Sequence, residues 1–256
     1  MKNVIMSQLY EIRKSRLFFI VISGIMLLCL VMCLIDYDEF GTSGILVYVS
    51  SLIALFAAFC PCFVTGFICA GDFPDKTINH EVTSGRLRKQ VFFGRTILAI
   101  VFSVLIGVGI MFFVLAVSTA LFSWGEIIPL RSYVLRSLLL AFPLFKLSCF
   151  YVMMSFIIKK PAVINCIGIA LYMLFSIISQ YASGSISGIH VFSIFVMMKL
   201  MNYDFYSTYG LQNDMDMVFD HTIDTSFVEF TVISSILIGI AYILIGYHFY
   251  DRDDLD

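Results

Sequence analysis

Six stretches of this chain are long and apolar enough to cross the hydrocarbon layer of a membrane. A helix needs about 20 mostly apolar residues to span that layer of roughly 30 Å. Only 13% of the residues are charged, whereas a soluble domain carries about 25%. We therefore expect an all-α integral membrane protein that forms a single transmembrane domain over residues 1–256, with spans at about 17–35, 45–70, 97–122, 134–158, 161–179 and 227–250.

Basic residues are concentrated in alternate connections, and this predicts the orientation. An excess of Lys and Arg marks the cytoplasmic side of a membrane protein. The first span is expected to be retained, since no small-x-small cleavage site follows it. Both termini are then predicted to be cytoplasmic, on the side that holds Lys2, Arg13, Lys14, Arg16, Lys76, Arg86, Arg88, Lys89, Arg95, Lys159, Lys160 and Arg252.

Two segments outside the spans have apolar residues at helical spacing. In residues 3–16 these are Val4, Ile5, Leu9 and Ile12, which suits an interfacial amphipathic helix; a disordered charged tail is the alternative. The outer region 180–226 begins with an apolar half that is too short to span. It predicts one or two re-entrant or interfacial helices, with a sharp entry permitted by Gly184 and Gly188.

The second half of the outer region is acidic. A calcium-binding loop would explain this, but the EF-hand pattern needs Gly at its sixth and Glu at its twelfth position, and neither is present in NDMDMVFDH. A solvated acidic loop is the favoured interpretation of Asp204, Asp214, Asp216, Asp220 and Asp224.

His80-Glu81 matches the first four positions of the zinc-protease motif H-E-x-x-H, whose two His ligands lie one helical turn apart. Here the fifth position is Ser84. The other histidines are His190, His221 and His248, which the predicted topology places at different ends of the spans. The seven cysteines all lie in apolar runs, where they are expected to pack as small residues. We therefore predict no metal site and no catalytic residue.

The complete layout resembles a type-2 ABC exporter permease, the architecture also called ABCG-like. GDFPDKTINHEVTSGRLRKQVFFGR looks like the second cytoplasmic loop of that superfamily, and YHFYDRDDLD resembles its frequent C-terminal sequence. The small size, the lack of a large external domain and the apolar character resemble the Gram-positive exporters of amphipathic or antimicrobial peptides. The resemblance implies a multi-pass protein of the plasma membrane, without nucleic acid as a partner.

The resemblance also implies a division of labour. A separate cytoplasmic ABC ATPase would bind ATP and Mg, and a second permease copy or close paralogue would complete a homo- or heterodimer in membrane lipid. The chain has no G-x-x-x-x-G-K-[ST] phosphate loop, so it would bind no cofactor of its own. The family's coupling helix would lie in the 71–96 loop, at Asp72, Phe73, Pro74, Asp75, Lys76, Thr77, Ile78, Asn79, His80 and Glu81.

Three residues within the spans are candidates for the translocation path. Lys146 is expected deep in the fourth span, where a cation is costly unless it faces water, protein or the surface. It would either attract an acidic group of the cargo, or pair with a carbonyl near Pro143, or lie near the outer surface. Pro61 and Pro143 should bend their helices, either as gates or as fixed kinks.

Three classes of function remain open from the sequence. The first is the permease subunit of an ATP-driven exporter of a hydrophobic or amphipathic cargo, with a peptide toxin or antimicrobial peptide preferred over a small-molecule antibiotic or sodium. The second is a secondary transporter or channel without an ATPase, although such proteins often use intramembrane carboxylates and no predicted span has one in its interior. The third is a membrane anchor or sensor.

Overall fold

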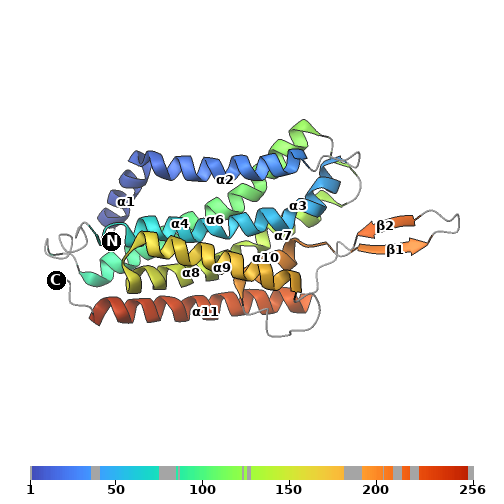
Figure 1. The fold of residues 1–256 in the computed structure, drawn as a ribbon. Coiled ribbons are helices and arrows are strands. Elements are labelled where there is room, and N and C mark those ends of the chain that lie inside the picture. The colour runs from blue at the N-terminus through green and yellow to red at the C-terminus, as the bar shows by residue number, and fades with distance from the viewer. Residues whose placement is uncertain are drawn as a thin grey trace.

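A computed structural model of the chain shows a bundle of long apolar helices (Figure 1). The structure describes residues 2–35, 41–74, 85, 87–122, 124–125, 128–181, 192–203, 205–209, 215–219 and 225–252. Within these residues, five helices are long and apolar enough to span a membrane. The expectation of a helical membrane-embedded protein is confirmed at this level. Both chain ends lie at the same end of the bundle (Figure 1).

The helices follow the predicted stretches closely, with differences at their ends. In chain order the elements are α1 (Lys2–Lys14), α2 (Arg16–Ile35), α3 (Gly41–Ala57), α4 (Phe59–Thr65), the π-helix η1 (Gly66–Ala70), α6 (Arg88–Leu121), α7 (Leu130–Leu139), α8 (Ala141–Ile158), α9 (Pro161–Tyr181), α10 (Ser193–Met201), β1 (Phe205–Tyr209), β2 (Met215–Phe219) and α11 (Thr225–Arg252).

The two prolines interrupt the second and fourth predicted spans. A proline has no N–H to donate to the carbonyl four residues earlier, and its ring crowds that carbonyl. Accordingly α3 ends at Ala57, four residues before Pro61, and α7 ends at Leu139, four residues before Pro143. Each span therefore consists of two or more helical segments in series.

Helix α8 is the centre of the bundle, and small residues on its neighbours let it pack closely. A Cβ on Gly107 of α6 would lie 2.7 Å from Leu144 Cδ1, and one on Gly239 of α11 would lie 2.6 Å from Phe145 Cε1. Close helix contact through small residues is a main source of stability in membranes, where apolar burial supplies little.

The fifth predicted span forms α9, a helix of 21 residues that lies beside α8 and α4. At about 1.5 Å per residue it is about 30 Å long. Helix α6 begins nine residues earlier than the predicted third span, at Arg88. The predicted 71–96 loop is therefore shorter, because its last residues are helical.

The outer region differs from its prediction. It contains one short apolar helix, α10, and then an antiparallel hairpin in which Phe205 pairs with Phe219 and Tyr209 with Met215. No strand was predicted here. The alternating MDMVF and the β-prone FYSTY, separated by a turn-forming stretch, are the signals that could have shown it. Gly184 and Gly188 lie outside the described residues, so the proposed re-entrant entry stays a prediction.

A tight contact between α4 and α9 gives a test of this packing. A Cβ on Gly168 would overlap Cys62 Sγ. We expect Gly168→Ala to destabilise the protein by about 1–3 kcal/mol through overpacking, measured by unfolding in detergent. Cys62→Ala should restore part of the loss in the double variant. Gly109→Ala, where a Cβ meets nothing within 4 Å, is the control; equal loss in the two Ala variants would contradict the packing.

Candidate functional site

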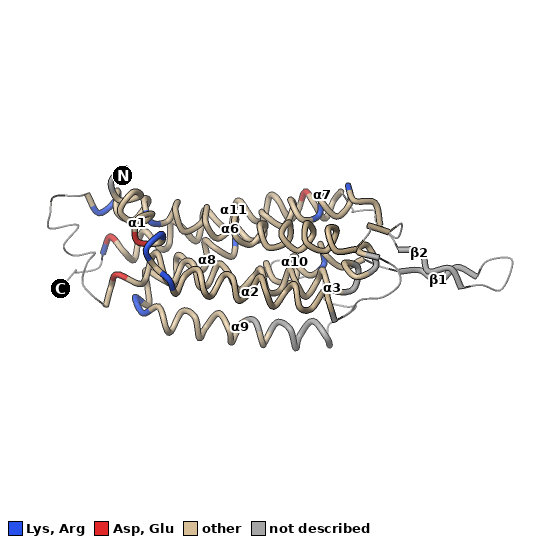
Figure 2. Tube along the Cα trace, turned by 90° about the horizontal axis from the view of Figure 1, so that it is seen from above, with Lys and Arg blue, Asp and Glu red and all other residues tan. Residues whose placement is uncertain are grey.

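Charged residues lie mainly at the two ends of the bundle, and mostly at the end with both termini (Figure 2). We call this end the basic end. Helices α1, α8 and α11 finish there, and α2, α6 and α9 begin there. Its described cations are Arg13, Lys14, Arg16, Arg88, Lys89, Arg95, Lys159, Lys160 and Arg252.

The first turn of the loop after η1, residues 71–74, is held at the basic end by an ion pair. Arg95 Nη1 of α6 lies 2.6 Å from Asp72 Oδ2, and only 1% of the arginine side chain is exposed against 14% of the aspartate. Gln8 Nε2 of α1 donates to the same carboxylate oxygen at 3.0 Å. Asp72 therefore joins the loop to two helices that are distant in sequence.

The next residue, Phe73, fixes the loop to a third helix. Its ring meets the ring of Phe156 of α8 edge-on, at 6.1 Å between centroids. The Lys159 Nζ lies 5.7 Å from the centroid of Phe73. Lys159 ends α8 in the left-handed conformation, with φ of 58°, and burial lowers the pKa of its amine. We refer to residues 71–74 with these partners as the loop base.

The segment that enters the loop base is a π-helix. Single π-turns within α-helices are rare and occur often at functional positions. Directly before it, Thr65 Oγ1 donates to the Pro61 carbonyl at 2.6 Å, and Ser155 Oγ of α8 lies 3.5 Å from the Thr65 carbonyl. The segment from Pro61 to Asp72 therefore departs from regular α-helical geometry and is hydrogen-bonded to α8.

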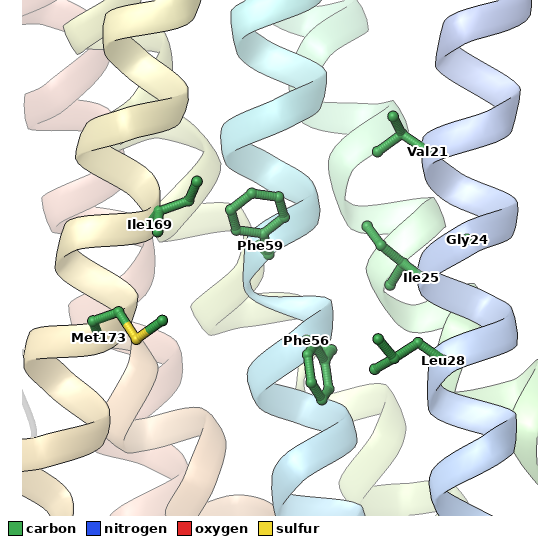
Figure 3. A pocket seen from close by; sticks show the side chains of 8 residues that line it. All are labelled: Val21, Gly24, Ile25, Leu28, Phe56, Phe59, Ile169 and Met173. Carbon is green, nitrogen blue, oxygen red and sulfur yellow. The ribbon is translucent and has the colours of Figure 1, made fainter.

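A second feature is an apolar groove between α2, α3–α4 and α9 (Figure 3). It encloses a volume of about 350 Å³. Phe56 and Phe59 stand on either side of the helix interruption at Ala58 and face the groove, with α2 on one side and α9 on the other. The lining is entirely apolar: Val21, Gly24, Ile25, Leu28, Phe56, Phe59, Ile169 and Met173.

The predicted path residues are not brought together. Pro61 is buried on α4, two residues after the groove residue Phe59. Lys146, only 2% exposed, lies on the stripe of α8 that faces α11, because Phe150 one turn later packs on Tyr242 at 5.5 Å. Neither Lys146 nor Pro143 lines the groove.

Arg136, which the sequence analysis did not single out, has a structural role. Arg136 Nη1 donates to the carbonyls of Leu200 and Asn202, both at 2.9 Å. Its guanidinium lies 4.2 Å from the centroid of the Tyr203 ring. Cations stabilise the C-terminal carbonyls of a helix, so Arg136 fixes the end of α10 against α7.

Seven of the ten predicted coupling residues lie outside the described part of the chain; they are Asp75, Lys76, Thr77, Ile78, Asn79, His80 and Glu81. The structure places Asp72, Phe73 and Pro74. Their partners Gln8 and Phe156 were missed, and Arg95 and Lys159 were noted only as cations of the cytoplasmic side. Their distance in sequence leaves no local signal that could have found them.

Among the described residues, no three His, Cys, Asp or Glu side chains are grouped to hold a metal ion. No family model matches the chain, and no curated protein matches it. The function is therefore inferred from the arrangement at the basic end and from the groove.

The ion pair at the loop base can be tested by removing one partner. We expect Asp72→Asn to cost about 3–5 kcal/mol, because it leaves the nearly buried Arg95 without its carboxylate. The loss is measured as a lower free energy of unfolding in detergent. In the double variant Asp72→Asn/Arg95→Met, the loss of unfolding free energy should be smaller than the sum of the losses in the two single variants. Additive effects would show that the two side chains do not act as a pair; Arg88→Gln, at a more exposed contact, is the control.

Proposed function

We propose that this chain is the membrane-spanning permease subunit of an ATP-driven exporter, with a separate ATPase supplying the energy. The observation that carries the proposal is the loop base. Asp72 and Phe73 connect one short loop to α1, α6 and α8. A subunit driven by a partner needs such a rigid connection, because a flexible loop would absorb the applied movement.

The basic end is inferred to face the cytoplasm, since it carries most of the described cations. A pair of ATPase subunits would contact the segment from Asp75 to Glu81. Movement of this segment would pass through Asp72 to Arg95 of α6, and through Phe73 to Phe156 of α8. The π-helix between Thr65 and Asp72 would carry the same movement into α4.

The groove supports an apolar or amphipathic cargo. Its lining has no charged side chain, and the aromatic rings of Phe56 and Phe59 lie on both sides of a break in the helix. A change in the bend at Pro61 would alter the distance between these rings. The cargo is proposed to be a hydrophobic peptide or antimicrobial peptide, with α9 as a sixth span and a second permease copy completing the path.

A second candidate function is supported by Lys146. A cation buried in the middle of an apolar helix is expensive and is a mark of ion-coupled transporters and channels. Lys146 is buried on α8, one turn before Phe150, which packs on Tyr242 of α11, and it is not part of the loop base. An ATPase-independent transporter would use this site and would have no need of a rigid loop base.

One experiment separates the two functions. The tagged chain is purified from its native membranes in mild detergent, and the eluate is assayed for ATP hydrolysis. We expect a bound ATPase that is lost when residues 75–81 are scrambled and retained when residues 210–214 in the outer hairpin connection are scrambled. A folded chain without a bound ATPase would contradict the exporter and favour the Lys146 transporter.

Filling the groove should block transport without disturbing assembly. Gly24 lines the groove and a Cβ there meets nothing within 4 Å, so Gly24→Trp should fold and occupy much of the 350 Å³ volume. We expect at least about tenfold weaker binding of a fluorescent hydrophobic peptide, since a buried apolar side chain contributes about 1.5–3 kcal/mol. The ATPase should still co-purify. Gly109→Trp on α6 is the matched control, and equal binding by both variants would contradict the groove as the cargo site.

A further inference from the structure

Helix α1 has two faces of different character. Val4, Gln8 and Ile12 form a buried stripe against the bundle, and a Cβ on Gly94 of α6 would lie 3.2 Å from Val4 Cγ1. The opposite face is formed by Met6, Tyr10, Arg13 and Lys14, all exposed. At 100° per residue these four side chains lie in one row along the helix.

The exposed row combines large apolar side chains with cations. Met6 is 59% exposed and Tyr10 is 69% exposed. The row continues past the end of α1 into Arg16 and Leu17, which are also exposed. Glu11, the single carboxylate of α1, lies on the flank beside Ser7, outside the row. Among the residues that the structure describes, the row itself contains three cations and no carboxylate, and its net charge is positive.

The corner between α1 and α2 fixes where this row lies. Helix α1 ends at Lys14 and the apolar helix α2 begins at Arg16. The backbone N–H of Phe18 donates to Ser15 Oγ at 3.3 Å, which caps α2 and sets the turn. Figure 1 shows α1 inclined to α2 at the basic end. Since α2 enters the hydrocarbon layer here, α1 must lie at the level of the lipid headgroups.

We propose that the exposed row of α1 binds the anionic headgroups of membrane phospholipids. Tyr10 and Met6 would insert between the headgroups, while Arg13, Lys14 and Arg16 would contact their phosphates. The affinity of an interfacial helix for anionic lipid increases with its buried apolar area and with the electrostatic attraction of its cations, and the exposed row contributes to both. Charge complementarity selects the lipid: three cations with no carboxylate in the row favour a net negative headgroup over a zwitterionic one.

Lipid bound to the exposed row of α1 would also affect the loop base. Gln8, on the buried face of the same helix, donates to Asp72, so lipid that holds α1 in place also holds one of the partners of Asp72. The composition of the inner leaflet would then influence the loop base.

The test uses the purified full chain in nanodiscs of phosphatidylcholine, titrated with phosphatidylglycerol, with bound lipid counted by native mass spectrometry. Each cation near an anionic surface contributes roughly a fivefold factor. We expect the triple variant Arg13→Gln/Lys14→Gln/Arg16→Gln to bind phosphatidylglycerol at least about tenfold more weakly. The matched control is Lys89→Gln/Lys160→Gln/Arg252→Gln, three exposed cations of the same end. Equal losses in the two triples, or no loss in the first, would overturn the proposal.

A second measurement leaves all cations in place. Trp124 is the single tryptophan of the chain, so Tyr10→Trp in a Trp124→Phe background gives one fluorescent reporter on the row. We expect brominated phosphatidylglycerol to quench it about twice as strongly as brominated phosphatidylcholine at the same mole fraction. Equal quenching would contradict the headgroup selectivity, and absence of quenching by both lipids would contradict the membrane position of α1.

Discussion

The contact between Asp72 and Arg95 constrains the basic end more than any other interaction. An arginine that is 1% exposed is tolerated in such an environment only if its charge is paired and hydrogen-bonded. The aspartate must therefore remain beside α6, and this fixes the position at which the chain leaves the π-helix. Gln8 then holds α1 to the same carboxylate. Three segments with no local relationship in sequence share one anchoring point, which determines where the loop begins.

The spans could be predicted because bilayer thickness and apolar length are sufficient to identify them. The residues at which the spans begin and end could not be predicted. The predicted third span began at 97, because Arg88, Lys89 and Arg95 suggested a charged loop, whereas α6 begins at Arg88. The charge of Arg95 is acceptable inside the helix end because Asp72 neutralises it, and that pairing depends on tertiary contact. Local sequence is sufficient where one physical property decides the structure. The missing N–H of proline is such a property, and it ends α3 and α7 four residues before Pro61 and Pro143.

The candidate site also combines residues that the sequence predicts with contacts that only the tertiary structure shows. Asp72 and Phe73 could be selected from the sequence because they form part of a motif, but their partners lie on α1, α6 and α8. Lys146 could be recognised as unusual from its position alone, yet its neighbours could not. The structure places it on the α11 side of α8, whereas the groove lies between α2, α3–α4 and α9. The groove itself had no sequence signature, since every span is apolar.

The geometry of the second predicted span connects the groove with the ion pair at the loop base. Between the groove residue Phe59 and the ion pair at Asp72 the chain contains a proline, a short α-helix and a π-helix. A regular α-helix would transmit a rotation rigidly along its length, whereas a missing hydrogen bond and a π-turn are positions where a helix can change its register or bend at low cost. Thr65 and Ser155 connect the middle of this segment to α8, so a displacement at Asp72 that reaches Thr65 would move α4 together with α8, and the bend at Pro61 is the next point at which the helix can yield. Phe56 and Phe59 stand on the two sides of the break at Ala58. A small angular change at that break would therefore alter the shape of the groove more than that of the helices around it.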